Sequence, residues 1–282
     1  MSAAEYSHPV PANIPQSQYL TLSINVFNEL ASRWNSSYCG GGLKWQWRQS
    51  NRGYDYKSTI ANGAFFQLGA RLARYTGNLT YAEWADKTYT WLESVAFLKS
   101  ATYKVLDGAG DAPDNCTKID QHQWSYNTAA VLYGSAVMAN ITRSAKWLTR
   151  TQGLVAAASK KFFTPFPNAT NVMYEYECEK TAVCNTDQFS FKAYLARWMG
   201  KASRLVDSIA PDVNDLLKAS ALAAASSCSG ESIGSTCGTR WYVGGWDGTK
   251  GAGQQMSALE TVLSCLVRNV PPPDTAEGVH WE

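Results

Sequence analysis

A segment of small and apolar residues recurs along this chain at a nearly constant interval. Its copies begin at Asn62, Asn127, Phe191 and Gln255, which are 65, 64 and 64 residues apart. Within each copy the apolar residues follow the period of an α-helix, so each is predicted to be a helix that packs toward the inside of the molecule. A fixed period of this length is typical of proteins built from repeated structural units.

A second, more amphipathic helix is predicted after the inner one in three repeats, over residues 80–95, 144–160 and 213–227. In the first repeat Gly77 separates the two helices, and glycine commonly ends a helix. The same pattern places one more outer helix near residues 16–34. Residues 1–6 are then expected to be the tail of the inner helix that precedes it.

Segments rich in glycine, aspartate and aromatic residues separate the repeats, at residues 39–56, 103–123, 173–188 and 239–254. Each segment precedes an inner helix, so we expect these loops to gather on one face around a common axis. Stacked helical hairpins form either an open solenoid or a closed toroid, and the period is compatible with both. In a toroid the loops would surround a sugar-binding cleft.

The composition narrows the class of ligand. Twenty-five basic and 23 acidic residues leave a formal charge of +2, with no long basic run, which disfavours nucleic acid as a partner. Aromatic residues are abundant, with 11 Trp, 15 Tyr and 9 Phe. Most aromatic side chains serve packing in any protein. The remainder suit a carbohydrate site, because the apolar faces of sugar rings stack on Trp and Tyr.

Cysteines and glycosylation sequons indicate the secretory pathway. Seven cysteines are many for a cytosolic chain of this size. Five Asn-x-Ser/Thr sequons are candidate glycosylation sites, at Asn35, Asn78, Asn115, Asn140 and Asn168. The first residues lack the features of a signal peptide, and no transmembrane run occurs. We therefore expect a secreted or cell-surface protein whose signal peptide lies on a stretch that this chain lacks.

Cysteine spacing predicts local disulfide bonds rather than a metal site. Two pairs each bracket a short loop, and neither fits a zinc-binding pattern: Cys178 with Cys184, and Cys228 with Cys237. Cys39 and Cys116 lie in irregular segments and are a third candidate pair. Cys265 is left over, and we expect either a free buried thiol or a partner on a segment outside this chain.

Six segments of the chain resemble one family of sugar-processing enzymes. They are CGGGLKWQW at 39–47, GYDYKSTIANG at 53–63, ARLARYTGN at 70–78, QWSYN at 123–127, DQFSFK at 187–192 and GQQMSALE at 253–260. Their ordered set is similar to glycoside hydrolase family 76, and most similar to its fungal cell-wall branch of mannan endo-1,6-α-mannosidases. The resemblance runs from Met1 to Val267, in order and without large gaps.

This resemblance implies an all-α fold, an (α/α)6 toroid of helical hairpins. Residues 1–267 would form a partial catalytic-type domain that lacks the first helices, and residues 268–282 an extended tail. It also implies hydrolysis or transfer at α-1,6-linked mannose with retention of configuration. The substrate would be cell-wall mannan or a glycolipid-anchor glycan. No cofactor and no metal are implied, and the protein is expected to be a monomer without a membrane span.

Retaining chemistry requires two carboxyl groups about 5–5.5 Å apart. In this family they are expected as adjacent aspartates at the start of an inner helix. That helix would lie upstream of Met1, and no Asp-Asp pair occurs among the 282 residues. We therefore assign the catalytic role to no residue of this chain. Two alternatives stay open: an inactive carbohydrate-binding remnant, and a helical-repeat scaffold for protein partners.

The candidate substrate-binding residues come from the loops and from the starts of the inner helices. Trp45 and Trp124 are predicted as platforms for sugar rings. Hydrogen-bonding partners for mannose hydroxyls are predicted at Asp55, Asn62, Asn127, Asp187 and Gln188. Helix-cap or loop roles are the alternative for these polar residues, since Asn and Asp are common there. His122, beside Trp124, is expected to be a loop residue rather than a donor to the ligand.

Overall fold

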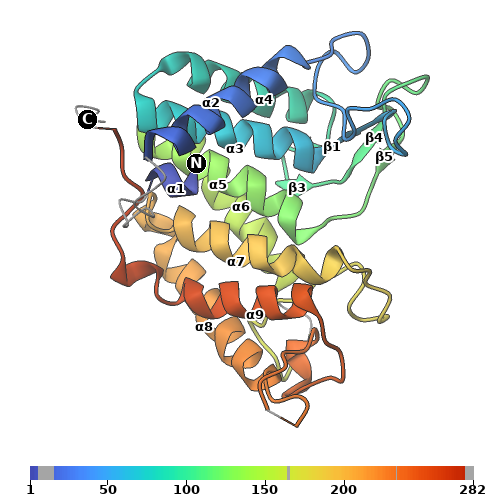
Figure 1. Cartoon of the computed structure of the whole chain (residues 1–282), viewed down its shortest axis with the longest axis vertical. Helices are drawn as coiled ribbons and strands as arrows, with labels where there is room; N and C mark the ends of the chain where they lie inside the picture. Colours follow the sequence, from blue (N-terminus) through green and yellow to red (C-terminus); the bar gives the residue numbers. More distant parts are fainter. Residues whose placement is uncertain (6–15, 164–165, 233, 277–282) are drawn as a thin grey trace.

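The computed structural model of this chain describes residues 1–5, 16–163, 166–232 and 234–276. Within these ranges α-helices dominate (Figure 1). Four of them match the recurring inner segment: α3 (Thr59–Thr76), α5 (Ser125–Thr142), α7 (Phe191–Ala202) and α9 (Ala252–Ser264). Each inner helix packs against the next one, and this arrangement agrees with the predicted repeat.

A second layer of helices covers the inner ones. It contains α2 (Gln16–Ser32), α4 (Leu79–Ser94), α6 (Ala145–Phe162) and α8 (Ala210–Ser227). The inner helix α5 packs against α3, α7 and α6, which explains why its sequence is small and apolar on almost every side. The short helix α1 (Ser2–Glu5) packs against α2.

The turn between α3 and α4 shows how the sequence sets the helix ends. Ser58 begins α3, and its hydroxyl accepts a hydrogen bond from the Ala61 backbone N at 3.2 Å. Gly77 ends α3 in the left-handed conformation, as predicted. The Asn78 side chain then accepts a hydrogen bond from the Thr80 backbone N at 3.0 Å and begins α4.

Short strands order the first two loops. In a three-stranded antiparallel sheet, β4 (Gly108–Gly110) pairs with β1 (Tyr56–Ser58) and with β5 (Ile119–Asp120), while β2 (Leu98–Lys99) and β3 (Lys104–Val105) form a hairpin. Gly108 faces Ser58 in this sheet, and a β-carbon at Gly108 would clash with the Lys57 carbonyl oxygen. Single 3-10 turns occur at η1 (Gln188–Ser190), η2 (Asp207–Ile209), η3 (Trp241–Val243) and η4 (Val267–Asn269).

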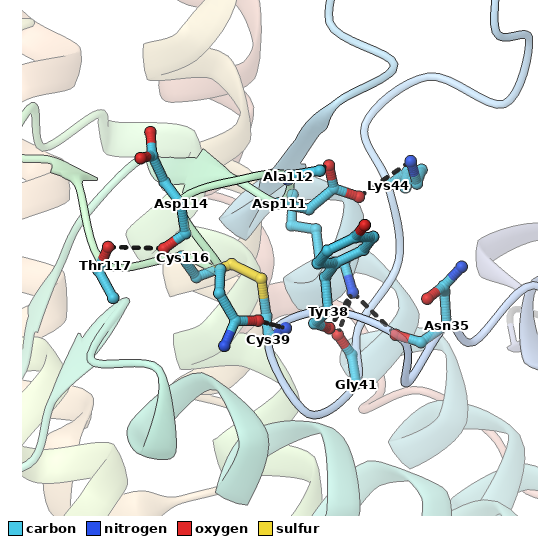
Figure 2. The surroundings of a disulfide bond; sticks show 12 residues. Asn35, Tyr38, Cys39, Gly41, Lys44, Asp111, Ala112, Asp114, Cys116 and Thr117 are labelled. Carbon is cyan, nitrogen blue, oxygen red and sulfur yellow. Dashed lines mark hydrogen bonds and ion pairs between the residues drawn. A yellow bond between two sulfur atoms is a disulfide. The ribbon is translucent and has the colours of Figure 1, made fainter.

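The loop before β1 is built around a buried lysine. The Lys57 ammonium donates to the backbone carbonyls of Asn35 at 2.8 Å, Tyr38 at 2.8 Å and Gly41 at 2.5 Å. Burial lowers the pKa of Lys57 to about 8. The disulfide between Cys39 and Cys116 joins the same loop to the segment between β4 and β5 (Figure 2). Two consecutive loops of the repeat are therefore held as one unit.

The candidate disulfide pairs all form. Cys178 is bonded to Cys184, and Cys228 to Cys237, each across a short loop. Cys265 is free and exposed, so the expectation of a buried thiol is wrong. Cys265 follows the last turn of α9, where Val262 and Leu263 are also exposed.

The segment after η4 crosses the ends of the inner helices opposite the loops (Figure 1). The Arg74 guanidinium, at the end of α3, donates to the Pro273 carbonyl at 2.7 Å. The Asp274 backbone N donates to the Glu5 carbonyl at 2.6 Å. This tail therefore ties α1 to α3. Across the described ranges, no helix is both long and apolar enough to cross a lipid bilayer.

Candidate functional site

The inner helices all begin at the same end of the molecule, so the loops that precede them meet there (Figure 1). These loops span residues 33–55, 106–124, 166–187 and 244–251 between their flanking elements. The loop face carries Trp45, Trp124 and Asp187, which the sequence placed in a shared binding site.

The indole of Trp45 is held by its neighbours and about half of it stays exposed. Its backbone N donates to the Tyr56 carbonyl at 2.7 Å, and its indole contacts the Tyr56 ring edge to face, with 6.4 Å between centroids. Gly53 lies against the indole with φ of +89°, and a β-carbon there would clash with the ring. The side that remains open leaves Trp45 51% exposed. A fixed, exposed indole of this kind suits a sugar ring.

Tyr56 connects this platform to a carboxylate. The Tyr56 hydroxyl donates to Asp107 Oδ2 at 2.9 Å, and Asn127 Nδ2 donates to Asp107 Oδ1 at 3.0 Å. Burial raises the pKa of Asp107 above its usual value. Asn127 is fully buried, and its Oδ1 accepts no hydrogen bond from any residue in the described ranges. Three polar side chains, from β1, from the residue just before β4 and from α5, are thus joined by hydrogen bonds at Asp107.

A second group of aromatic residues continues the site past Asp107. His122 Nδ1 lies 2.5 Å from Asp120 Oδ1, and this hydrogen bond raises the pKa of His122. The imidazole stacks parallel to Trp124, with 5.8 Å between centroids and 17° between planes. Trp124 in turn contacts the Phe191 ring edge to face at 5.7 Å. As expected, His122 lies on the loop, and most of its side chain faces solvent.

The first turns of α5 and α7 meet through aromatic stacking. Tyr126 lies parallel to Phe191, with 3.9 Å between centroids and 7° between planes. The predicted binding residues Asp187 and Gln188 stand just before Phe191. Asn185 Oδ1 accepts from both of their backbone N atoms at 3.0 Å, and Gln188 Oε1 accepts from the Asn185 backbone N at 2.8 Å. The Asp187 side chain is exposed on the same face.

Two other predicted residues have different surroundings. Asn62 is fully buried and its amide is used by the protein: Oδ1 accepts from the Leu43 backbone N at 2.7 Å, and Nδ2 donates to the Leu43 and Ser58 carbonyls. It therefore acts as a support for the Trp45 loop. Asp55 is the opposite case, because its side chain is 72% exposed and lies 3.9 Å from the Lys44 ammonium.

A cavity of about 620 Å³ opens beside Trp45. Lys44, Trp47 and Tyr54 line it together with residues of α2 and α3. A groove of similar volume, about 600 Å³, lies between α6 and α8, and no aromatic side chain lines it. The cavity beside Trp45 is therefore the better match for a sugar ring. Among the described residues, no cluster of three or more His, Cys, Asp or Glu side chains could hold a metal ion.

The site also contains residues that the sequence did not single out, namely Tyr56, Asp107, Asp120 and Tyr126. Tyr56 and Tyr126 stand inside the segments that carry the family resemblance, so their motif was a usable signal. Asp107 precedes Gly108 and is indistinguishable in sequence from an ordinary turn residue. Its role depends on contacts with β1 and α5, which lie far from it in the chain.

The sequons differ in what their asparagine side chains do. Three are used as hydrogen-bond acceptors in loops or turns: Asn35, Asn78 and Asn115. Asn140, in the last turn of α5, accepts from Arg74 Nε at 3.0 Å and donates to the Leu205 carbonyl at 3.3 Å. Asn168 is exposed in a turn.

We predict that a glycan is attached at Asn168 and not at Asn140. An N-linked glycan replaces a hydrogen on Nδ2 and must point into solvent, and only Asn168 of this pair meets that condition. Mass spectrometry of peptides from the folded protein, secreted by a eukaryotic host and treated with an amidase that removes N-glycans, measures the occupancy. Equal occupancy of the two sites would contradict the prediction.

The chain is similar to known proteins over most of its length. The model of glycosyl hydrolase family 76 matches residues 1–277. The chain is 46% identical over 280 residues to the mannan endo-1,6-alpha-mannosidase DCW1 of Saccharomyces cerevisiae, covering 99% of this chain and 60% of that protein. It is 43% identical over 269 residues to a putative mannan endo-1,6-alpha-mannosidase of Schizosaccharomyces pombe, covering 95% of this chain and 59% of that protein. This chain thus spans about 60% of the length of such relatives.

Solved structures confirm the predicted (α/α)6 class of fold. The crystal structure of Dfg5 from Chaetomium thermophilum in complex with glucosamine matches with a TM-score of 0.90 and 40% identity, covering 99% of this chain and 68% of that one. An alpha-1,6-mannanase of Salegentibacter matches with a TM-score of 0.71 and 18% identity, covering 89% and 70%. The Salegentibacter protein is an inactive variant, with two consecutive aspartates replaced by asparagine, in complex with alpha-1,6-mannotriose.

Proposed function

We propose that this chain, which belongs to glycosyl hydrolase family 76, forms a substrate-binding face for α-1,6-linked mannose in an endo-acting, retaining mannosidase or transglycosylase. The observation that carries the proposal is the continuous row from Trp45 through Tyr56 and Asp107 to Asn127. The substrate would be mannan of the fungal cell wall or a glycan of a glycolipid anchor, and the protein would act in the secreted or cell-surface compartment.

The chemistry of the row suits a polyhydroxylated ligand. Trp45 and Trp124 offer ring faces to the apolar sides of sugars. The Asp107 carboxylate is an acceptor for mannose hydroxyls, and the fully buried Asn127 orients it by donating from Nδ2 to Oδ1. The related Dfg5 binds glucosamine, an amino sugar whose ammonium would pair with Asp107 or Asp120.

The chain's own residues are proposed to bind and orient the glycan. Retention of configuration requires two carboxyl groups about 5–5.5 Å apart. The adjacent aspartates that the family resemblance implies do not occur among the 282 residues, and we do not transfer that role to Asp107, Asp120 or Asp187. This absence favours a second candidate function for the 282-residue chain by itself, carbohydrate binding without turnover.

The test measures binding and turnover separately on the 282-residue chain. Isothermal titration with α-1,6-mannotriose should detect binding, and Trp45→Ala should weaken it about tenfold, the equivalent of about 1.4 kcal/mol. Trp198→Ala is the matched control. This tryptophan lies in the second half of α7, outside the lining of the cavity beside Trp45, and its ring contacts the Tyr194 ring with 5.5 Å between centroids. We expect less than about a threefold effect from it.

Absence of binding at millimolar mannotriose, or equal effects of the two tryptophan variants, would refute the binding face. Release of mannose from α-1,6-mannobiose above a heat-inactivated control would refute the non-catalytic candidate for this chain. Binding without release would support it.

A further inference from the structure

The first turn of α5 has no cap of its own. Trp124 occupies the N-cap position, and its side chain makes no capping hydrogen bond. The exposed backbone N–H groups of a helix start normally bond to a Ser, Thr, Asp or Asn at this position. Because Trp124 cannot supply an acceptor, another part of the chain has to do so.

A glutamate from the next repeat supplies the acceptor. Glu175 Oε1 accepts a hydrogen bond from the Ser125 backbone N at 3.1 Å, and Oε2 accepts one from the Ser125 hydroxyl. Glu175 is 1% exposed. On the same loop, Glu177 Oε1 accepts from the Gln123 backbone N at 3.0 Å. The residues on both sides of Trp124 are therefore held by one loop.

We propose that Glu175 is a positioning residue, whose buried carboxyl holds the first turn of α5 in place through its hydrogen bonds to Ser125. It thereby fixes Trp124 and Asn127 in the geometry that binds the glycan. The inference rests on the proposed function for the glycan, but the contact between Glu175 and the first turn of α5 is a property of the folded chain. On this proposal, the loop before α7 supports the binding face by holding α5 in place rather than by contacting the ligand directly.

The charge balance around Glu175 requires a bound proton. The Glu175 backbone N donates to Glu179 Oε1 at 2.9 Å, and the Lys192 ammonium on α7 lies 2.8 Å from the same oxygen. These three side chains are almost completely buried. The other ionisable groups that face Glu175 are Tyr126 of α5 and Tyr174 of its own loop. Two carboxyls thus share one ammonium, and a second uncompensated negative charge is costly in such a site.

Burial accordingly raises the pKa of Glu175 to about 8, so that the carboxyl is neutral below this value. When it ionises, the cluster gains an unpaired charge, and water must enter beneath α5 to solvate it. The first turn of α5 is therefore expected to stay ordered at acidic and neutral pH and to become more mobile in the alkaline range.

Hydrogen exchange of the backbone amides at residues 123–128 tests this directly. For the unmodified chain, protection factors corrected for the intrinsic rate should fall about tenfold or more between about pH 6 and about pH 10. Glu175→Gln keeps the shape, an oxygen acceptor and a neutral state, so its protection should stay constant. Glu175→Leu removes the acceptors and should lose protection at every pH. Glu83→Gln, on the exposed side of α4, is the matched control and should behave like the unmodified chain.

A parallel fall in Glu175→Gln and the unmodified chain would overturn the inference, as would constant protection in the unmodified chain. Titration with α-1,6-mannotriose supplies the second readout. Affinity should decline more steeply in the alkaline range for the unmodified chain than for Glu175→Gln, because Lys57 also loses its charge near pH 8 in both proteins. If hydrogen exchange shows the expected pH dependence but neither the unmodified chain nor any variant binds the glycan at any pH, the proposed function is wrong. The role of Glu175 in holding the first turn of α5 is then still supported.

Discussion

Replacing Asp107 by alanine should reduce the affinity for α-1,6-mannotriose at least about 100-fold. The substitution removes a carboxylate acceptor, and hydrogen bonds to charged groups contribute about 1.5–3 kcal/mol each. It also leaves the Tyr56 hydroxyl and the Asn127 amide without their acceptor, so that two further side chains of the row lose their positions. Isothermal titration of the folded variant measures the loss, with far-UV circular dichroism as a check on folding.

The control for this variant is Asp114→Ala, which removes a carboxylate from the segment between β4 and β5 that follows Asp107 in the chain. Asp114 pairs with Lys118 at 3.0 Å and takes no part in the row. It should change the affinity less than about threefold. Because the pKa of Asp107 is raised, affinity that depends on its carboxylate should also decline on acidification earlier than for an ordinary aspartate. An Asp107→Ala variant that binds as tightly as the control would remove Asp107 from the site.

The helical repeat was predictable because it depends on local pattern. An inner helix must be small and apolar on nearly all sides when other helices surround it, and α5 shows this over its whole length. The period of the loops followed from the same repeat. The position of Trp45 and Trp124 in the loops was predictable, since aromatic residues in polar, glycine-rich loops have no obvious core to fill; their role as platforms for sugar rings stays a prediction.

The polar part of the site was less predictable, because it depends on contacts between distant segments. Asn62 and Asn127 look alike in sequence, each near the start of an inner helix. The amide of Asn62 is hydrogen-bonded to the backbone of Leu43 and Ser58. The side-chain oxygen of Asn127 is buried and accepts no hydrogen bond from any described residue. Glu175 lies 50 residues from the serine that it caps, and no sequence pattern links the two. Burial of Trp241 against the Lys192 ammonium, 3.7 Å from its ring, is equally invisible in sequence.

Replacing Lys192 by methionine should lower the free energy of unfolding by about 3–5 kcal/mol, the usual cost of removing one partner of a buried ion pair. The ammonium lies 2.8 Å from Glu179 Oε1 and donates to the Thr239 carbonyl at 2.5 Å, so it joins two loops to α7. Its loss leaves Glu179 charged and unpaired in a site where burial already raises the pKa of that carboxyl. Urea denaturation followed by tryptophan fluorescence measures the change.

A second substitution separates the lost charge balance from lost packing. In the double variant Lys192→Met with Glu179→Met, no uncompensated carboxylate remains, and at least half of the lost stability should return. Lys146→Met is the surface control. Its ammonium is largely exposed and lies 3.7 Å from Asp86, so its loss should cost less than about 1 kcal/mol. If Lys192→Met were no more destabilising than this control, the buried cluster would not hold the loops together. The position of the first turn of α5 would then depend only on the hydrogen bonds between Ser125 and Glu175.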